Sequence, residues 1–568
     1  MRLSLALAIV GTVVVVTTPL AQMPGDRPAG NMRGTRSMAV ARNGMIATSQ
    51  ALASAAGLKV LQDGGNAIDA AVTAAAVLAV IEPSMNGIGG DLFAIVFDAK
   101  TKRLHALDAS GRAGSRATPE EFARRQLTDV PGSGVLSITV PGVVSGWSAL
   151  MTRFGTIGLE KALAPAIRHA RDGFPVQEIV ASEWKDSEKK LSGDAAAART
   201  FLRNGRAPAV GEVFSNPNLA RSLELIARAG ADAFYKGPIG QAIAADLERR
   251  NGLIEAADLA SHTADWVDTI SVNYRGYDVH EMPPSTQGFV ALEMLNILEG
   301  LDIKAMGHNT AEYLHAVTEA KKIAFADRAA YLADRRHVPA AVMEMLLSKD
   351  YAARRRKEID PNRAGTYTAG VPAASSAAPV EFAGLDGGDT IYMTAADGQG
   401  NVISLIQSLF GSFGSGIVAG ETGIVLHNRG SGFTLDAGHP NQVAPGKRPL
   451  HTLVPAMILR DGRPWVSFGV MGGDNQGQAH AQVVMNLVDF GMDIQTAGEA
   501  ARMRHMGQHL ALESGIGAEV RKALEARGHT IRDGRGAMGG FQGILIDPRT
   551  GVLMGGSDVR KDGLAIGW

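Results

Sequence analysis

The sequence predicts a layered protein that contains both helices and strands, and three features indicate this class. Apolar residues at helical spacing dominate up to about residue 357. Residues 364–388, rich in Ala, Gly, Ser and Pro, then have the composition of a linker. Beyond the linker, short β-type runs alternate with turn signals before helical patterns return. This order of segments fits a layered α/β arrangement.

The composition is that of a globular protein with enough apolar material for a large core. The chain has 568 residues, 45% hydrophobic and 20% charged. A formal net charge of −1 gives no broad field for nucleic acid or an anionic membrane surface, so no nucleic-acid partner is expected. The chain contains no cysteine, which excludes disulfides, thiolate metal sites and a cysteine nucleophile.

The N-terminus has the pattern of a secretory signal peptide. Arg2 precedes an apolar run from Leu3 to Val16, and Pro19-x-Ala21 follows as an imperfect cleavage site. We therefore expect residues 1–21 to be a signal peptide and the mature protein to be periplasmic or secreted. An uncleaved membrane anchor is the alternative, although the run is at the short limit for a span.

Helical spacing organises the first half of the chain. Ala51 to Val80 is Ala-rich and is interrupted by Asp63-Gly64-Gly65-Asn66, which predicts one helix stop and one new start. The second of these helices is apolar on most sides and should be buried. The charged run from Glu319 to Tyr331 predicts a solvated helix face. Further helices are expected at 158–173, 218–230, 238–250, 310–335, 340–357, 477–490 and 516–527.

Strand patterns follow the linker, and the first two form a predicted hairpin. Thr390 begins the first strand, a turn signal spans 397–401, and the second strand runs from Val402 to Leu409. Paired residue numbers then sum to about 798, so Ser408 faces Thr390 with Cβ atoms about 5 Å apart. Other strands are expected at 423–428, 453–460, 465–470 and 541–547.

A threonine at the start of a strand after a linker has chemical potential if it becomes an N-terminus. Its hydroxyl is a weak nucleophile that needs a base. A free α-amine, with a reference pKa of about 7.7–8.0, supplies that base on the same residue. Gly387-Gly388 before Asp389 permits the strained backbone that attack on the preceding peptide requires. Cleavage between Asp389 and Thr390 would give chains 22–389 and 390–568 that stay packed together. On the local pattern alone, Thr390 is more often an ordinary strand residue.

Eight motifs spread over nearly the whole chain carry a family resemblance. In order they are Asp63–Ala71, Pro83–Asp91, Val140-Pro141-Gly142, Ala170–Phe174, Gly388-Asp389-Thr390, Gly411–Gly416, Pro445–Pro449 and Met471-Gly472-Gly473-Asp474. This series resembles the γ-glutamyltranspeptidases, a family of N-terminal-nucleophile hydrolases.

The resemblance implies a fold, a mechanism and partners. The fold would be an α+β, four-layer αββα sandwich. Thr390 would form an acyl-enzyme, with Ser408 as its hydroxyl partner. Gly472 and Gly473 would form the oxyanion hole, in which each donor contributes about 2.7–4 kcal/mol. The substrate would be a small acyl amide, with water or an amine as acceptor and no cofactor or metal. Large and small subunits would stay associated, and the resemblance leaves a homodimer open.

The donor pocket departs from the typical family pattern after Leu426-His427-Asn428. Arg429 stands at the usual glutamine position and Gly432 at an aspartate position that, in typical members, bind the donor's α-amino group. A cation there repels an ammonium and attracts a carboxylate. The alternative is that Arg429 is a surface or salt-bridged arginine.

Three more positions bear on the donor. An asparagine expected after the second strand is replaced by Phe410, and a serine pair by His451-Thr452, which can still donate hydrogen bonds. Arg112 is the candidate for a carboxylate-binding arginine. Together with Asn428 and Arg429, these residues form the predicted substrate-binding set.

The altered pocket resembles the branch with oxamate amidohydrolases and glutaryl-cephalosporin acylases. We therefore expect either a γ-glutamyl donor or an acyl donor with a carboxylate and no α-amine. A catalytically inactive solute-binding protein on the same scaffold, and a membrane-anchored assembly factor, are the competing classes.

Two other signals are rejected. His505 and His509 have the i, i+4 spacing of a helical metal pair, but Gly507 lies between them and the His-Glu-x-x-His pattern is not completed. Gly534-x-Gly536-x-x-Gly539 precedes a strand where a dinucleotide fingerprint needs a helix. No Gly-x-Ser-x-Gly elbow occurs, which argues against an α/β-hydrolase.

Overall fold

The computed structural model describes residues 35–370, 390–534 and 538–568. The predicted signal peptide at 1–21, most of the predicted linker and Asp389 lie outside these ranges, so those predictions stand as they were made. Within the described ranges, no helix is both long enough and apolar enough to cross a membrane.

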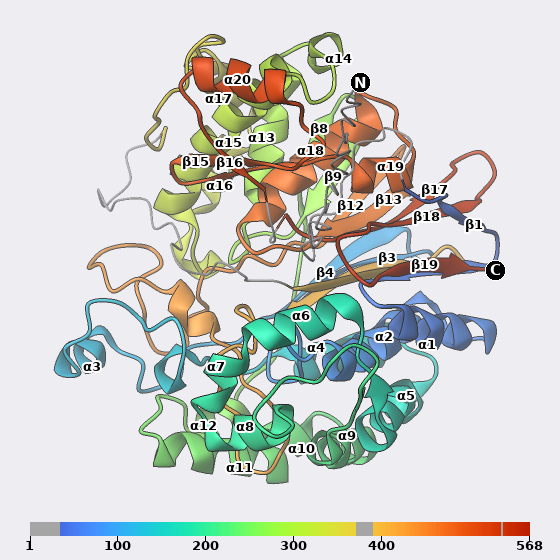
Figure 1. Ribbon diagram of the computed structural model, residues 1–568, viewed down its shortest axis with the longest axis vertical. Coiled ribbons are helices and arrows are strands. Elements are labelled where there is room, and N and C mark those ends of the chain that lie inside the picture. The colour runs from blue at the N-terminus through green and yellow to red at the C-terminus, as the bar shows by residue number, and fades with distance from the viewer. Residues whose placement is uncertain (1–34, 371–389, 535–537) are drawn as a thin grey trace, which may run out of the picture.

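Two seven-stranded sheets are stacked between helices, which gives four layers (Figure 1). This confirms the αββα sandwich. The β13 sheet has the order β1 (Ala39–Ala41), β18 (Leu553–Ser557), β17 (Phe541–Ile546), β13 (Arg463–Val470), β12 (Ala456–Arg460), β9 (Tyr277–Glu281) and β8 (Ile270–Tyr274). The β10 sheet has the order β19 (Leu564–Gly567), β2 (Gly44–Thr48), β10 (Ile391–Asp397), β11 (Val402–Ser408), β3 (Asp91–Asp98), β4 (Arg103–Ala109) and β7 (Asp265–Val267).

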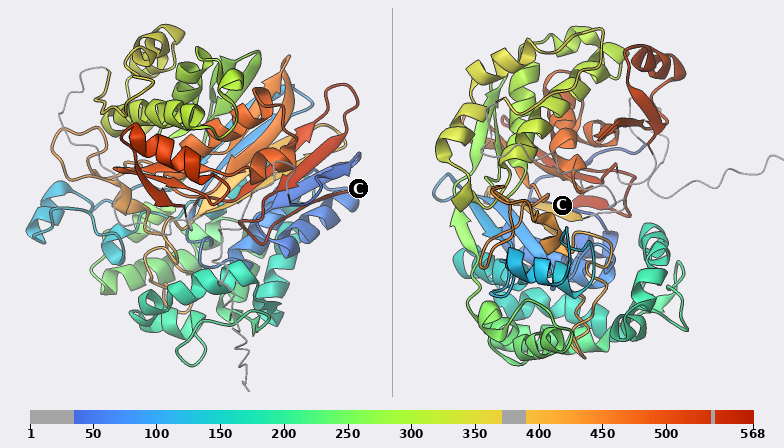
Figure 2. Two further views of the ribbon diagram at one scale, coloured as in Figure 1. Left: turned by 45° about the horizontal axis from the view of Figure 1, so that its top comes forward. Right: turned by 90° about the vertical axis from the view of Figure 1, so that its left-hand side faces the viewer.

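Each sheet buries its outer face under helices, as both views of Figure 2 show. Helices that cover the β10 sheet are α1 (Ala51–Gln62), α2 (Ala67–Ile81), α4 (Val143–Phe154) and α5 (Gly158–Asp172). The β13 sheet is covered by α13 (Gly288–Glu299), α15 (Ala311–Tyr331), α18 (Asn475–Val488) and α19 (Ile494–Glu499).

The remaining helices and strands lie around the two layers of helices. They are β5 (Phe174–Pro175), β6 (Val213–Phe214), β14 (Met503–Met506), β15 (His509–Leu512), β16 (Thr530–Asp533), α3 (Pro119–Arg124), α6 (Glu178–Asp186), α7 (Glu188–Ser192), α8 (Ala195–Phe201), α9 (Pro217–Ala229), α10 (Asp232–Tyr235), α11 (Pro238–Arg249), α12 (Ala256–Ala260), α14 (Ile303–Met306), α16 (Ala340–Leu346), α17 (Lys349–Arg356) and α20 (Ala518–Ala526).

Alternation along β10 divides its side chains between two cores. Ile391 and Met393 pack against the helices below the β10 sheet. Tyr392 and Ala396 belong to the core between the two sheets. Because side chains on a strand alternate between its faces, every even-numbered residue of β10 points toward the β13 sheet.

The start of α2 illustrates how the sequence sets the helix boundaries. The Asn66 side chain accepts hydrogen bonds from the N–H groups of Ile68 and Asp69, and the Asp69 carboxylate accepts from the Asn66 N–H at 2.9 Å. This reciprocal cap satisfies donors that the first turn cannot pair, so the break predicted at 63–66 is confirmed.

Several element predictions need correction. The span 340–357 forms two helices, α16 and α17, instead of one. The span 423–428 forms isolated bridges, including Leu426 to Gly89, and no strand. Strands β1 to β4 and β7 to β9 precede the linker, so the expected order of helices first and strands later is wrong. The strand β3 was missed because a fully buried strand has a continuous apolar run with no alternation.

The prediction of a solvated face for 319–331 is also wrong. Glu319, Lys321, Asp327 and Arg328 are all buried on α15. Partners from other segments pair with them: the Tyr351 hydroxyl donates to Asp327 at 2.6 Å, and Arg328 forms an ion pair with Asp474. A charged helix face can be buried when other segments supply the opposite charges.

Candidate active site

The hairpin of β10 and β11 has the predicted register. Ile391 pairs with Gln407, and the pairing continues to Ala396 with Val402, so the residue numbers sum to 798 throughout. Extending this register by one residue sets Thr390 opposite Ser408. Thr390 is 2% exposed, and Ser408 is fully buried.

Asp91 lies beside Ser408 on the next strand of the β10 sheet. Ser408 pairs with Asp91, the first residue of β3. Phe93 and Ile95, which alternate with Asp91 in phase, belong to the core between the sheets. Thr390, Ser408 and Asp91 therefore occupy the same end of three adjacent strands and share the face that looks toward the β13 sheet.

Two contacts fix how the β13 sheet lies over this row. The Thr394 hydroxyl donates to the Ser467 hydroxyl at 2.7 Å across the two sheets. Two residues along, the Tyr392 ring packs so tightly on Gly469 that a Cβ atom there would come within 2.4 Å of it. Two residues farther in the same direction are Thr390 beyond Tyr392 and Met471 beyond Gly469, and Met471 directly precedes Gly472 and Gly473.

Gly472 and Gly473, the predicted oxyanion-hole residues, form a turn with positive φ angles. Their φ angles are 115° and 58°, a region that only glycine enters readily. Within the described part of the chain, no backbone carbonyl accepts a hydrogen bond from either N–H. They lie just before α18, where the helix dipole favours negative charge. The Gln287 side chain steadies this turn, because it donates to the Gly473 carbonyl at 3.0 Å.

Asp91 is the centre of a buried polar cluster. Its Oδ2 lies 3.1 Å from His451 Nε2, 3.4 Å from His427 Nδ1 and 3.9 Å from Arg429 Nε. Its Oδ1 accepts from the Gly111 N–H at 2.8 Å. All four clustered side chains are buried.

The charges in this cluster can be assigned. Burial alone would raise the pKa of Asp91, but His427, His451 and Arg429 outweigh it and hold the pKa below its usual range. Burial, with help from Arg429, lowers the pKa of His451 to about 3. Its Nδ1 accepts from the Leu453 N–H at 3.3 Å, so a neutral His451 carries its proton on Nε2 and donates to Asp91. Burial also lowers the pKa of His427. At neutral pH, Arg429 is thus the cation that balances Asp91.

Arg429 is a buried guanidinium with unused hydrogen-bonding capacity. Its Nη1 donates to Thr452 Oγ1 at 3.1 Å, and its Cζ lies 3.8 Å from the centroid of the Phe410 ring. Among the residues described, neither Nε nor Nη2 has a hydrogen-bond partner. Burial lowers the pKa of Arg429 to about 9, so the group stays protonated at neutral pH. Of the alternative of a surface or salt-bridged arginine, the surface form is wrong because Arg429 is fully buried, whereas the salt-bridged form agrees with its ion pair with Asp91.

Phe410 and Asn428 connect Arg429 to the Thr390 row. The Phe410 N–H donates to Ser408 Oγ at 2.7 Å, and its φ of 77° turns the chain sharply after β11. The Asn428 side chain accepts from the Gly411 N–H at 2.9 Å and donates to the Gly132 carbonyl at 2.7 Å. Asn428 therefore holds the loop that carries Phe410.

The structure brings most of the predicted substrate-binding residues together. Arg429, His451 and Thr452 meet around Asp91. The Arg112 guanidinium instead lies 3.0 Å from Asp265 and 3.8 Å from Asp334, neither of which contacts Arg429. Asp389 lies outside the described residues.

Sequence reasoning missed the part played by Asp91. It ends the motif Pro83–Asp91, but nothing near it in sequence indicates His427, His451 or Arg429 as its neighbours. The available signal was an acidic residue at the start of an otherwise apolar run, which needs a buried partner. His505 and His509 lie on the hairpin of β14 and β15, so helical i, i+4 spacing does not apply to them.

Residues 53–568 match the profile of the family described as gamma-glutamyltranspeptidase. The chain belongs to that family. It is therefore an amidohydrolase, and the glutathione hydrolase relatives that it matches are proenzymes.

Its relatives cover nearly the full chain. A glutathione hydrolase-like YwrD proenzyme of Bacillus subtilis is 38% identical over 92% of this chain and 98% of its own length. An oxamate amidohydrolase proenzyme of Klebsiella pneumoniae is 35% identical over 93% of this chain and 99% of its own. The crystal structure of a cephalosporin acylase from Bacillus halodurans superposes with a TM-score of 0.88 at 40% identity, covering 94% of this chain and 97% of that one.

Proposed function

We propose that this family member cleaves itself between Asp389 and Thr390 and then hydrolyses amides whose acyl group ends in a carboxylate and has no α-amine. The observation that carries the substrate class is the Arg429 guanidinium, which is buried and protonated and keeps Nε and Nη2 without hydrogen-bond partners among the described residues. A carboxylate is the ligand that satisfies two such donors at once.

The proposed chemistry uses the neighbouring hydroxyl groups of Thr390 and Ser408. After cleavage, the Thr390 α-amine takes the proton of its own hydroxyl, and Oγ attacks the substrate carbonyl. The N–H groups of Gly472 and Gly473 stabilise the oxyanion. The amine leaves with the proton, and water, or an amine acceptor, resolves the Thr390 ester. Ser408, opposite Thr390, is the hydroxyl best placed to orient the nucleophile.

A γ-glutamyl donor is the alternative, and it needs an anion for its ammonium. Asp91 is the nearest carboxylate, but its oxygens already face Gly111, His451 and Arg429. An ammonium beside Arg429 would meet a like charge in a buried site. The geometry therefore supports glutaryl or oxamate-type donors over γ-glutamyl donors.

The test of the mechanism is the intact mass of Thr390→Ala beside the wild type. Wild type should give two chains, the smaller beginning at Thr390, and Thr390→Ala should stay uncut and inactive. Retained cleavage in Thr390→Ala would sink the mechanism.

The test of the substrate class compares glutaryl-4-nitroanilide with γ-glutamyl-4-nitroanilide. Glutaryl amide should be the better substrate by kcat/KM. Arg429→Gln should raise KM for it, with Arg429→Lys intermediate because a lysine keeps the charge and loses the planar fork. Equal kcat/KM for the two wild-type substrates would contradict this part of the proposal.

We further propose that the protein is exported, on the strength of Arg2 and the apolar run behind it. N-terminal sequencing of the large subunit from fractionated cells should find a start near residue 22 in the exported fraction. A cytoplasmic protein that begins at Met1 would rule this out.

A further inference from the structure

A cavity of about 410 Å³ lies between α15, the hairpin of β14 and β15, and the segment 364–367. Basic side chains dominate its polar lining. They are Lys321, Lys322 and Arg328 from α15, with His505 and His529 opposite. None of these residues belongs to the cluster around Asp91 and Thr390.

The described residues that line this cavity include three cations and no aspartate or glutamate. Lys322 Nζ lies 2.7 Å from Glu319 Oε1, and Arg328 pairs with Asp474. Lys321 Nζ lies 3.1 Å from His505 Nδ1. Burial first, and then Lys321 and Lys322, lower the pKa of His505 to about 2. Burial and Lys322 lower the pKa of His529 to about 4, against the opposing effect of Glu319.

Arg328 supplies an independent sign of a ligand. Its side chain is only 4% exposed, and its Nε has no hydrogen-bond partner among the residues that the structure describes. Its Nη2 reaches Asp474, the residue directly after Gly473. The Arg328 side chain therefore connects the cavity to the turn that carries the proposed oxyanion hole.

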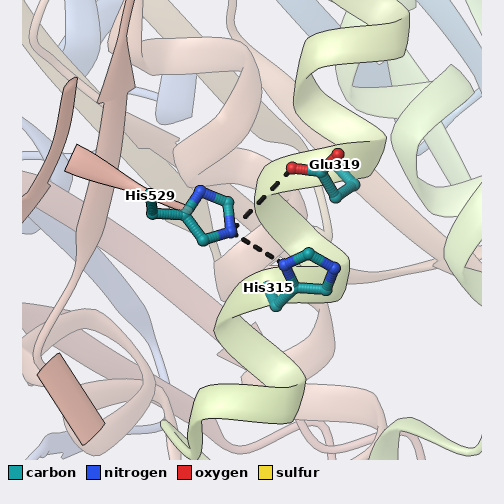
Figure 3. Close-up of side chains that lie close together, drawn as sticks. All are labelled: His315, Glu319 and His529. Carbon is teal, nitrogen blue, oxygen red and sulfur yellow. Dashed lines mark hydrogen bonds and ion pairs between the residues drawn. The ribbon is translucent and has the colours of Figure 1, made fainter. Parts of the chain in front are cut away.

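His529 lines the cavity, and behind it lie His315 and Glu319, which Figure 3 shows in contact with it. His315 Nε2 lies 2.8 Å from the Asp360 carbonyl and must donate to it, so His315 Nδ1 accepts from His529 Nε2 at 2.8 Å. Glu319 also accepts from the Gly365 N–H at 2.7 Å and the Tyr367 hydroxyl at 2.6 Å.

These bonds decide between a cation and an anion as the occupant. A metal on His315, Glu319 and His529 would have to break the His315–His529 bond and sit beside the Lys322 ammonium. An oxyanion in the cavity breaks none of these bonds and lies among the three cations.

We propose that this cavity binds a small oxyanion, with Arg328 as its main ligand. Two sources share this chemistry: a carboxylate on the amine half of the substrate, and free inorganic phosphate. The first rests on the proposed function, since the amine half leaves, or arrives, beside the oxyanion turn.

Binding is measured by calorimetry on the processed enzyme at neutral pH, with three probes. These are inorganic phosphate, 4-aminobenzoate, and aniline as the match that lacks the carboxylate. Phosphate should bind at one site per enzyme and weaken at least tenfold in Arg328→Gln and in Arg328→Lys, the variant that keeps a charge at Asp474. Arg429→Lys, at the proposed donor site, should leave the phosphate binding that depends on Arg328 unchanged.

The remaining arms identify the occupant. If 4-aminobenzoate binds more tightly than aniline and competes with phosphate, the site takes the amine half of the substrate. If only phosphate binds, the site takes a free oxyanion. The proposal fails if neither anion binds saturably, or if binding survives in folded Arg328 variants. It also fails if Zn²⁺ binds in place of phosphate and His529→Gln abolishes that binding. Phosphate binding needs no turnover, so an inactive enzyme that binds phosphate would refute the proposed function alone.

Discussion

The Thr394 hydroxyl donates a 2.7 Å hydrogen bond to the Ser467 hydroxyl and so joins the two sheets directly. This bond lies four residues from Thr390 along β10 and four residues before Met471 along β13. It therefore helps to fix the position of the strand that leads to the proposed nucleophile relative to the strand that leads to the proposed oxyanion turn. Loss of this hydrogen bond between the sheets should slow the reactions that need residues from both sheets more than it lowers stability.

Thr394→Val should remove this hydrogen bond and slow self-cleavage. The buried Ser467 hydroxyl would lose its donor, at a cost of about 1–3 kcal/mol. Time courses of intact mass would measure cleavage, and thermal unfolding would measure stability. Thr318→Val is the control, since the buried Thr318 hydroxyl also donates within the core, to the Leu314 carbonyl at 2.6 Å with Met503 Sδ 3.8 Å away, but lies on α15 outside both sheets. Equal cleavage rates in the two variants would contradict a role for the Thr394–Ser467 bond in self-cleavage.

Gly472→Ala should lower kcat by about 10²-fold, the magnitude found when one oxyanion donor is lost, with less effect on KM. An alanine at a φ of 115° is strained and will move the N–H away from the oxyanion. Gly276→Ala is the control: Gly276 has a φ of 89° and open space around it, in the turn between β8 and β9. If both variants kept wild-type kcat, Gly472 would be an ordinary turn residue.

Asp91→Asn should destabilise the protein and impair turnover together. It leaves the buried Arg429 charge without its carboxylate, and breaking one side of a buried pair costs about 3–5 kcal/mol. Thermal unfolding and kcat/KM for a glutaryl amide would report both effects. Asp98→Asn, at the more exposed end of the same strand, should change neither. A stable and active Asp91→Asn variant would show that Asp91 does not organise the pocket.

Glu82 should make stability depend on pH. Burial raises the pKa of Glu82 to about 8, with Lys561 opposing, and its Oε2 accepts from the Ser49 hydroxyl at 2.9 Å. Between pH 4.5 and 8 the folded protein keeps a proton here that the unfolded chain has released. Folding stability from this group is thus present below pH 4.5 and is lost as pH rises to about 8.

Replacing the carboxyl tests this dependence. Glu82→Gln cannot titrate, so its thermal midpoint should fall less than that of wild type between pH 5.5 and 8. Parallel curves for the two proteins would mean that Glu82 is not protonated in the folded state.

The sequence predicted the hairpin at 390–409 because its register depends only on the turn at 397–401, which is local. Asp91 and its partners could not be predicted this way. They come from β3, from the loop after 426 and from the segment at 451, and only the stacking of strands brings them together. Helix α15 shows the same limit. Its charges resemble a solvated face until Tyr351, Asp474 and the 365–367 segment are placed against them.

The proposed cleavage before Thr390 would have a consequence for how the enzyme recovers from unfolding. Both sheets interleave strands from either side of that position: β2 and β3 flank the hairpin of β10 and β11, while β1 and β9 flank the four strands β18, β17, β13 and β12. Once the chain is cut, lost structure can return only when two separate polypeptides meet again. Refolding then becomes second order in protein concentration, whereas the precursor refolds as one chain. The mature enzyme would depend for its lifetime on the height of its unfolding barrier.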